Sequence, residues 1–188
     1  MNLIKLGLAS LLAAGSLFAS TYNVDKSHSS VNFKIKHMMV SNTKGTFDQF
    51  KGSFDYDEKT KTLKDLDGVI EVASINTANT KRDNHLRAND MFDAKKYPLI
   101  TFKLTKLDGD EAYGDLTMKG VTKNIKLDFE NGGTIKDPWG NERAGFALSG
   151  KIKRADFGLT YNSVLEAGGL AIGEIVKLDI EIEGIKAK

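Results

Sequence analysis

A period-two alternation of apolar and polar residues recurs in short runs along most of this chain. The last run is the plainest, with apolar residues at every second position: Val176, Leu178, Ile180 and Ile182. Successive side chains of a β-strand point to opposite faces, so such a run predicts a strand with one buried and one exposed face. No helix pattern competes with it there, because the apolar spacing is two rather than three or four.

Seven further runs repeat the alternation, and glycine-containing turns separate most of them. They cover residues 31–35, 54–56, 66–72, 100–104, 112–118, 125–129 and 146–152. Eight strands, each with one apolar face, close readily into a barrel whose interior holds side chains or one small ligand. The sequence therefore predicts an all-β protein, an eight-stranded antiparallel barrel with one short helix docked on it.

The predicted helix lies between the runs at 66–72 and 100–104. Its first residues, from Thr80 to Asp83, have the hydroxyl-x-x-acid pattern of a capping box. At about 100° per residue, Arg82 and His85 share one face, while Asp83 and Arg87 form an i,i+4 pair on another. A helix this short is marginal in isolation, so we expect it to pack on the barrel.

The first residues have the features of a secretory signal peptide. Lys5 precedes an apolar run from about Leu6 to Ala14, and small residues follow up to Ala19. The run is shorter than the roughly 20 residues that a membrane-spanning helix needs, although an uncleaved anchor stays open as an alternative. We expect residues 1–19 to be a cleaved signal peptide and residues 20–188 to be one exported domain without stable membrane insertion.

Composition narrows the classes of partner. The chain has 27 Lys and Arg against 25 Asp and Glu, with no basic block, which argues against nucleic acid as a partner. It has no cysteine, so a disulfide cannot stabilise the exported domain. Removing 19 of 188 residues leaves 169, enough for one hydrophobic core to supply the stability instead.

Three polar residues fall on the apolar faces of their runs. His37 continues the face of residues 31–35, Arg154 continues the face of residues 146–152, and Glu174 precedes the last run with the same parity. All three lie at strand ends, near a barrel mouth. Either Arg154 forms a structural ion pair with an acid such as Glu174, or these groups bind the polar end of a ligand.

Catalysis has little support in the sequence. The three histidines, His28, His37 and His85, lack the close spacing of most metal sites, and no nucleophile elbow, Walker loop or dinucleotide fingerprint occurs. We therefore expect no metal, no cofactor and no enzymatic activity. A metal-dependent hydrolase or lipid-modifying enzyme is one alternative, and a ligand-free stress or interaction barrel is another.

Motifs spread over the chain carry a family resemblance. The most specific are Ser74-Ile75-Asn76-Thr77, Arg82-Asp83-Asn84-His85-Leu86, Tyr97-Pro98-Leu99-Ile100-Thr101-Phe102 and Arg154-Ala155-Asp156-Phe157-Gly158-Leu159. From about Tyr22 to Glu183 the chain resembles the YceI-like polyisoprenoid-binding proteins, which are periplasmic lipocalin-like barrels. The resemblance implies an antiparallel barrel around a tunnel for a polyprenyl chain, a quinone or a fatty-acid-like lipid, with no established catalytic step.

The resemblance and the alternation together predict a periplasmic lipid carrier. Whether it is a monomer or a homodimer stays open. The expected head-group residues are His37, Arg82, His85 and Arg154. The expected residues around the lipid tail are Phe33, Ile35, Phe102, Phe146 and Leu148.

Overall fold

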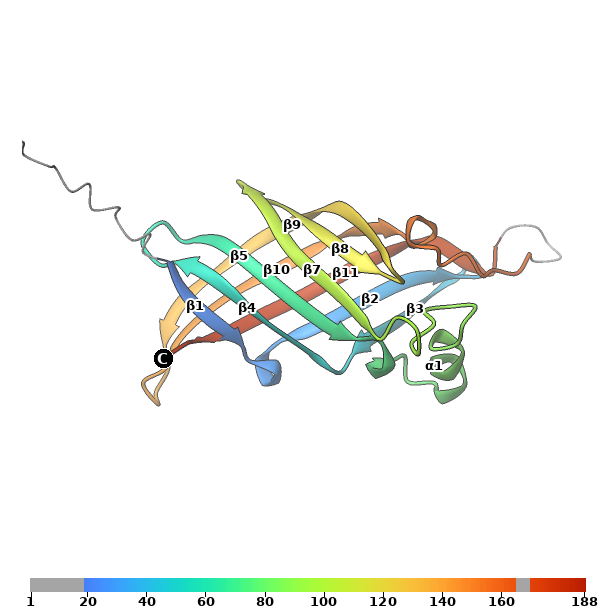
Figure 1. Cartoon of the computed structure of the whole chain (residues 1–188), viewed down its shortest axis with the longest axis horizontal. Helices are drawn as coiled ribbons and strands as arrows, with labels where there is room; N and C mark the ends of the chain where they lie inside the picture. The colour runs from blue at the N-terminus through green and yellow to red at the C-terminus, as the bar shows by residue number, and fades with distance from the viewer. Residues whose placement is uncertain (1–18, 165–169) are drawn as a thin grey trace, which may run out of the picture.

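Eight antiparallel strands form a closed ring in the computed structural model, which describes residues 19–164 and 170–188 (Figure 1). Each strand pairs with the next, and pairing of the first with the last closes the barrel. The ring consists, in spatial order, of β1 (Ala19–Val24), β4 (Phe50–Asp57), β5 (Thr62–Glu71), β7 (Leu99–Asp108), β8 (Glu111–Met118), β9 (Val121–Lys136), β10 (Glu142–Lys153) and β11 (Ile172–Lys186). The predicted fold class is confirmed.

Three more strands extend one end of the ring. They are β2 (Ser30–His37), β3 (Ser41–Phe47) and β6 (Ile75–Asn76). The long strand β11 makes this possible, because its C-terminal end pairs with β1 while its N-terminal part pairs with β2. Of these additions the alternation predicted β2 but neither β3 nor β6, and it also missed the ring strand β1.

The described helices are short and lie at strand ends. They comprise α1 (Thr80–Leu86) and three 3-10 turns, η1 (Lys26–His28), η2 (Val72–Ser74) and η3 (Arg154–Phe157). Helix α1 lies beyond the end of the barrel that β2 and β3 extend (Figure 1). Within the described residues, no helix is long and apolar enough to cross a membrane.

The start of α1 differs from the predicted capping box. Asn79, not Thr80, is the N-cap, and its side chain accepts a hydrogen bond from the backbone N–H of Arg82. Asp83 is buried and accepts hydrogen bonds from the backbone N–H and the hydroxyl of Thr77. The predicted Asp83–Arg87 pair is therefore wrong, and both side chains anchor the helix to the segment before it instead.

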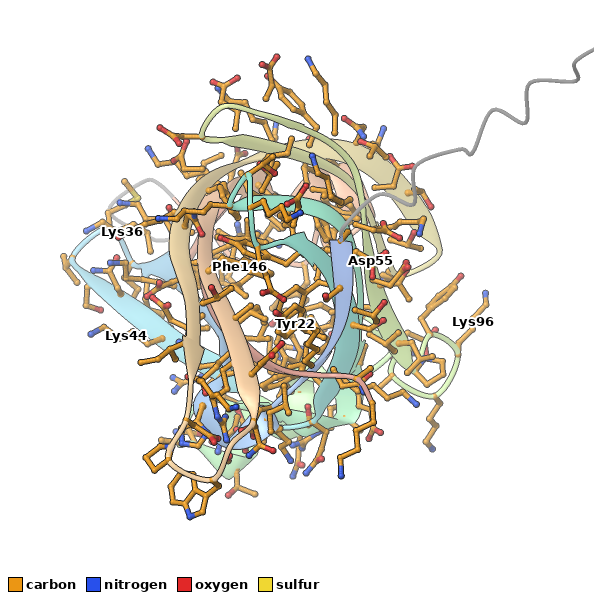
Figure 2. All side chains as sticks on the ribbon, turned by 90° about the vertical axis from the view of Figure 1, so that its left-hand side faces the viewer. Tyr22, Lys36, Lys44, Asp55, Lys96 and Phe146 are labelled. Carbon is orange, nitrogen blue, oxygen red and sulfur yellow. The ribbon has the colours of Figure 1, made fainter. Side chains whose placement is uncertain are left out.

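The barrel interior holds two cores with different contents. At the β1 end lies an aromatic plug, composed of Tyr22, Phe54, Tyr56, Phe129 and Phe146 with neighbouring leucines. Figure 2 shows Tyr22 and Phe146 inside the barrel, seen from that end. At the α1 end a second core leaves several large apolar side chains only partly buried.

Both tyrosine hydroxyls of the aromatic plug form hydrogen bonds at the outer end of the plug. The Tyr22 hydroxyl donates to Glu58 at 2.9 Å, and the Tyr56 hydroxyl donates to the Asn131 side chain at 2.8 Å. Burial, followed by the bond to Glu58, raises the pKa of Tyr22 far above its usual value. The Tyr22 hydroxyl therefore stays protonated, and both hydroxyls have the hydrogen-bond partner that a buried tyrosine needs.

The predicted signal peptide, residues 1–19, lies outside the described residues except for Ala19. That residue is the first of β1 and pairs with Asp57 of β4.

Candidate ligand cavity

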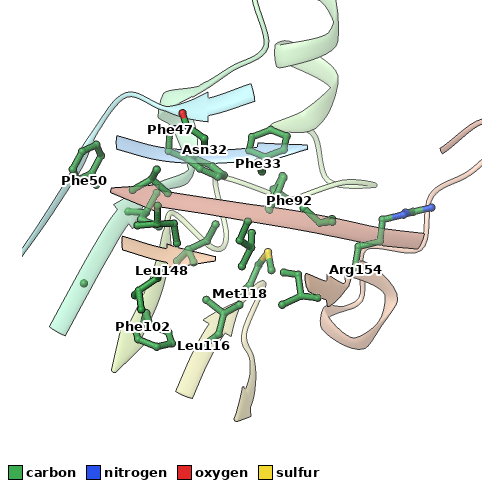
Figure 3. Close-up of a pocket in the computed structure, with 18 of the residues that line it drawn as sticks. Asn32, Phe33, Phe47, Phe50, Phe92, Phe102, Leu116, Met118, Leu148 and Arg154 are labelled. Atoms are coloured by element: carbon green, nitrogen blue, oxygen red, sulfur yellow. The ribbon is translucent and has the colours of Figure 1, made fainter. Parts of the chain in front are cut away.

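A cavity of about 360 Å³ occupies the barrel between the aromatic plug and α1. This volume falls within the roughly 300–1,000 Å³ of typical small-molecule sites. Most of the ring strands and β2 contribute inward-facing apolar side chains to its wall. Among them are Ile35, Ile70, Ile125 and Leu178. Figure 3 shows three others, Phe102, Leu116 and Leu148.

The alternation explains why this wall is apolar. Inward positions of β11, such as Val176 and Ile180, line the cavity, while the intervening Lys177, Asp179 and Glu181 are exposed. A strand with this pattern can hold a nonpolar ligand on one face and contact water on the other.

The cavity ends at the plug on one side. Leu66, Leu127 and Leu148 line the cavity and also belong to the packed core that contains Tyr22 and Phe54. They form its floor, so a ligand in the cavity reaches solvent through the side or the α1 end rather than through β1.

A glycine enlarges the cavity on the inner face of β5. Gly68 lies between the inward residues Leu66 and Ile70 and lines the cavity. A Cβ atom built on Gly68 would meet only the Phe102 carbonyl oxygen, at 4.0 Å. The missing side chain therefore leaves open space in the cavity.

Helix α1 brings polar groups to the cavity. Arg82 and His85 line it, as their common helix face predicted, and so does Leu86. The Arg82 guanidinium donates to the hydroxyl and the carbonyl of Thr77, which fixes its position. His85 Nε2 lies 2.9 Å from an Asp90 carboxylate oxygen, and its ring packs edge to face on Tyr161.

His37 lines the same end of the cavity from the last residue of β2. It pairs in register with Ile172 of β11, and both side chains line the cavity. Glu174 does not line the cavity, so the prediction that it lies on the inward face of its strand is wrong. A bulge between Ile172 and Val176 shifts the register, and Glu174 is exposed, 4.0 Å from the Lys153 ammonium.

Arg154 lines the cavity with its aliphatic stem, and its charged end is held by backbone (Figure 3). Its guanidinium is buried and donates to the carbonyl oxygens of Gly173, Leu159 and Tyr161. Burial lowers the pKa of Arg154 from its ordinary value, against a small opposing effect of Glu174. The arginine thus holds the connection between β10 and β11 in place. The acid expected as its partner, Glu174, does not pair with it, and neither does the nearby Asp156.

Eight of the nine predicted ligand residues line the cavity, and Phe146 is the exception. Its ring belongs to the aromatic plug, where it contacts Phe54 and Phe129. We therefore leave Phe146 out of the candidate site. Whether the other eight bind a ligand stays a prediction.

Several lining residues were missed in the sequence. Phe47 and Phe92 lie in the cavity wall, 6.2 Å apart in an edge-to-face pair, and Phe50 and Met91 join them. None of the four belongs to a long alternating run. Phe47 ends a polar strand and Phe92 lies in a loop, so only their apolar character in a polar context could have indicated them.

The histidines do not come together. His28 lies outside the cavity and contacts Asp25 at 2.9 Å, while His37 and His85 line the cavity. Ligand atoms of Asp25, His28 and Glu183 lie within 4.8 Å of one another. Arg143 already neutralises both acids, with nitrogen-oxygen distances of 2.8 and 2.6 Å, so this cluster is an ion-pair network rather than a good cation site.

Comparison with known proteins identifies relatives. The YceI-like domain family matches residues 22–184. Protein YceI of Escherichia coli O6:H1 is 42% identical over 194 aligned residues, covering 100% of this chain and 98% of that protein. A crystal structure of the Campylobacter jejuni YceI protein is 42% identical and superposes with a TM-score of 0.70, covering 82% of this chain and 91% of that one.

A more distant structure shares the fold. A polyisoprenoid binding domain from Saccharophagus degradans is 20% identical and has a TM-score of 0.63. The match covers 88% of this chain and 98% of that domain. At this identity the likeness concerns the barrel architecture.

Proposed function

This chain belongs to the YceI-like family, and we propose that it is a non-catalytic periplasmic protein that carries one long apolar lipid in its barrel. The observation that carries the proposal is the cavity itself. It is apolar, about 360 Å³ in volume, closed at one end by the aromatic plug, and lined with polar groups at the other end. Long lipids with a small polar head have the matching distribution of polarity.

The apolar wall can supply most of the binding free energy. Each buried CH₂ group contributes roughly 0.8 kcal/mol before the costs of ordering the chain. A tail with about ten buried carbons therefore needs no specific polar contact. Shape and length of the tail, rather than its chemistry, would then select among polyisoprenoids, quinones and fatty-acid-like lipids.

We assign the polar head of the lipid to the α1 end. His37, Arg82 and His85 line the cavity there and offer ring nitrogens and a guanidinium. Arg154 adds positive charge nearby, although backbone carbonyls already occupy its donors. A polar or anionic head is therefore favoured over an apolar one.

The ligand class and the location rest on separate support. The fold relative from Saccharophagus degradans is described as a polyisoprenoid binding domain, which favours an isoprenoid as the occupant. The leader-like composition of residues 1–19 favours export to the periplasm.

A carrier role needs no catalytic group in the cavity. Asp67 is the acid among the described lining residues, and its carboxylate binds the Lys103 ammonium on the outer surface at 2.9 Å. The two histidines of the lining, His37 and His85, are assigned to the polar head of the lipid.

A fluorescent long-chain lipid, titrated into the purified protein after lipid removal, tests the proposal. Ile180→Trp places a large ring in the cavity, whereas Glu181→Trp places the same ring on the outer face of the same strand. We expect saturable binding to the parent and to Glu181→Trp, and at least tenfold weaker binding to Ile180→Trp. Equal affinities for all three proteins would show that the lipid does not enter the cavity.

A further inference from the structure

The turn between β2 and β3 exposes three consecutive apolar residues. Met38, Met39 and Val40 are 44%, 63% and 83% exposed. The backbone N–H of Val40 donates to the His37 carbonyl at 3.2 Å, which closes a four-residue turn with the methionines in the middle. We refer to these three residues as the apolar tip.

The backbone of the apolar tip does not favour methionine. Met38 and Met39 have φ angles of 48° and 61°, in the left-handed region. Positive φ at both central positions is typical of a type I′ hairpin turn, which strongly prefers Asn-Gly. The methionines therefore make the turn less favourable, and their apolar side chains call for a reason outside the turn.

The apolar tip lies beside the cavity. The backbone N–H of Met38 donates to the Ala171 carbonyl at 2.8 Å. The flanking residues His37 and Ile172, which pair across β2 and β11, both line the cavity. A surface that contacts the tip is consequently close to the end of the cavity where the polar groups lie.

Four lysines lie directly opposite one another behind the tip, on the outer faces of neighbouring strands. Lys44 of β3 pairs with Lys34 of β2, Lys34 pairs with Lys177 of β11, and Lys177 pairs with Lys151 of β10. We call this set the lysine row. Figure 2 shows Lys44 and Lys36 outside the barrel on the same side. Lys36 lies on β2, two residues closer to the tip than Lys34.

The lysine row is unfavourable for the fold alone. Like charges in directly opposed cross-strand positions repel one another. In the part of the chain that the structure describes, none of the four ammonium groups has an ion-pair partner within 4.0 Å. The nearest acids on this outer face are Asp179 and Asp128. They lie in the neighbouring row of cross-strand partners, on the side of the lysine row that is farther from the tip.

We propose that this end of the barrel docks on the surface of a membrane that contains anionic lipids. The apolar tip enters the headgroup region, and the lysine row with Lys36 is attracted to the lipid phosphates. The strained, exposed methionines and the unpaired lysines then share one explanation. Docking goes beyond lipid binding in the cavity, and it would bring the cavity mouth to a source or acceptor of lipid.

Co-sedimentation with vesicles tests the docking surface. One vesicle preparation contains equal parts of phosphatidylglycerol and phosphatidylcholine, and the other contains phosphatidylcholine alone. We expect the full chain without its leader to bind the anionic vesicles at low salt, to bind the neutral ones far more weakly, and to detach as salt rises.

Two variants address the two parts of the surface. Met38→Asn with Met39→Gly removes the apolar tip but supplies the preferred turn residues, so the thermal midpoint should hold or rise while vesicle affinity falls at least about tenfold. Lys34→Gln with Lys44→Gln should weaken binding to anionic vesicles about twenty-fold and flatten its salt dependence.

Two controls separate docking from other causes. Trp139→Ser removes an apolar residue that is 82% exposed at the turn between β9 and β10, and it should leave vesicle binding unchanged. Ile180→Trp, which obstructs the cavity, should also bind vesicles like the parent. The proposal is overturned if the parent ignores anionic vesicles, if the tip variant binds like the parent, or if either control loses as much as the tip variant.

Discussion

Phe54 of β4 and Phe146 of β10 meet edge to face inside the barrel, with ring centroids 5.0 Å apart. Tyr22 stacks on Phe54 at 5.3 Å and extends the contact to β1, where the ring of strands closes. These rings fill the barrel at one end, so the space available to a ligand is confined to the other. The plug thus accounts for both the stability of the barrel and the shape of its cavity.

Truncating the plug should affect stability more than binding. Phe146→Ala removes a buried aromatic ring that does not line the cavity, and we expect it to lower the free energy of unfolding by about 3–5 kcal/mol. Phe102→Ala, in the cavity wall, should weaken lipid binding with a smaller loss of stability. Urea unfolding and lipid titration of both variants measure the two effects. If the plug were the ligand site, Phe146→Ala would weaken lipid binding more than Phe102→Ala does.

Filling the cavity from β5 should block the ligand without harming the fold. Gly68→Leu places its side chain in open space, so we expect an unfolding midpoint within a few degrees of the parent and strongly reduced lipid binding. The contrasting variant is Gly114→Ala, whose Cβ would overlap the Phe102 ring and lie 2.8 Å from the Lys103 carbonyl oxygen, so it should destabilise the barrel. Undiminished lipid binding by Gly68→Leu would contradict the cavity assignment.

Arg154 should matter first for structure. Arg154→Met leaves the buried carbonyl of Leu159 and the partly buried carbonyls of Tyr161 and Gly173 without this donor. An unsatisfied buried group costs about 1–3 kcal/mol. We expect a clear loss of stability in urea unfolding, and Arg154→Lys should restore only part of it because an ammonium lacks the guanidinium fork. An Arg154→Met protein that kept its stability but lost affinity for anionic lipids would instead make Arg154 a head-group ligand.

The Arg143 ion-pair network should make the protein sensitive to acid. Hydrogen bonds from Ser27 and then from Arg143 hold the pKa of Asp25 well below its usual range. The pKa of Asp137 is also lowered, because hydrogen bonds from Arg143 and Asn141 outweigh its burial.

A depressed carboxyl pKa adds stability that is fully present above the unfolded value, about 3.9 for aspartate, and is lost as the pH falls through the folded value. Arg143→Met should therefore lower the free energy of unfolding at pH 6 and reduce its decline between pH 4 and pH 2. Urea unfolding across this range measures both slopes. Parallel pH profiles for parent and variant would show that Arg143 does not set these pKa values.

The alternation predicted most of the barrel because burial on one face imposes a period of two. It identified which residues of β11 face inward, including Val176 and Ile180. It failed for β3, which carries Ser, Asn, Thr, Lys and Gly and contributes few apolar side chains to the interior. That strand forms through its backbone pairing with β2, a contact that leaves no apolar pattern in the sequence.

Two errors at the candidate site have specific physical causes. Glu174 was placed inward by extending the alternation of β11 into an irregular segment, where the four steps from Ile172 to Val176 match only two steps on β2. Ile172 and Val176 both line the cavity, but Glu174 between them is exposed. Phe146 was correctly placed inside the barrel, but parity says nothing about depth along the barrel axis. Whether an inward residue meets the plug or the cavity depends on the sizes of residues on distant strands, such as Phe54 and Phe129.

Native mass spectrometry of the protein isolated from its own cells tests the central claim most directly. We expect the parent to carry one lipid of defined mass with a long hydrocarbon chain, and Ile180→Trp, isolated in parallel, to be recovered without it. Glu181→Trp should carry the same lipid as the parent. Parent protein recovered repeatedly at its apo mass, or a lipid retained equally by Ile180→Trp, would contradict the account.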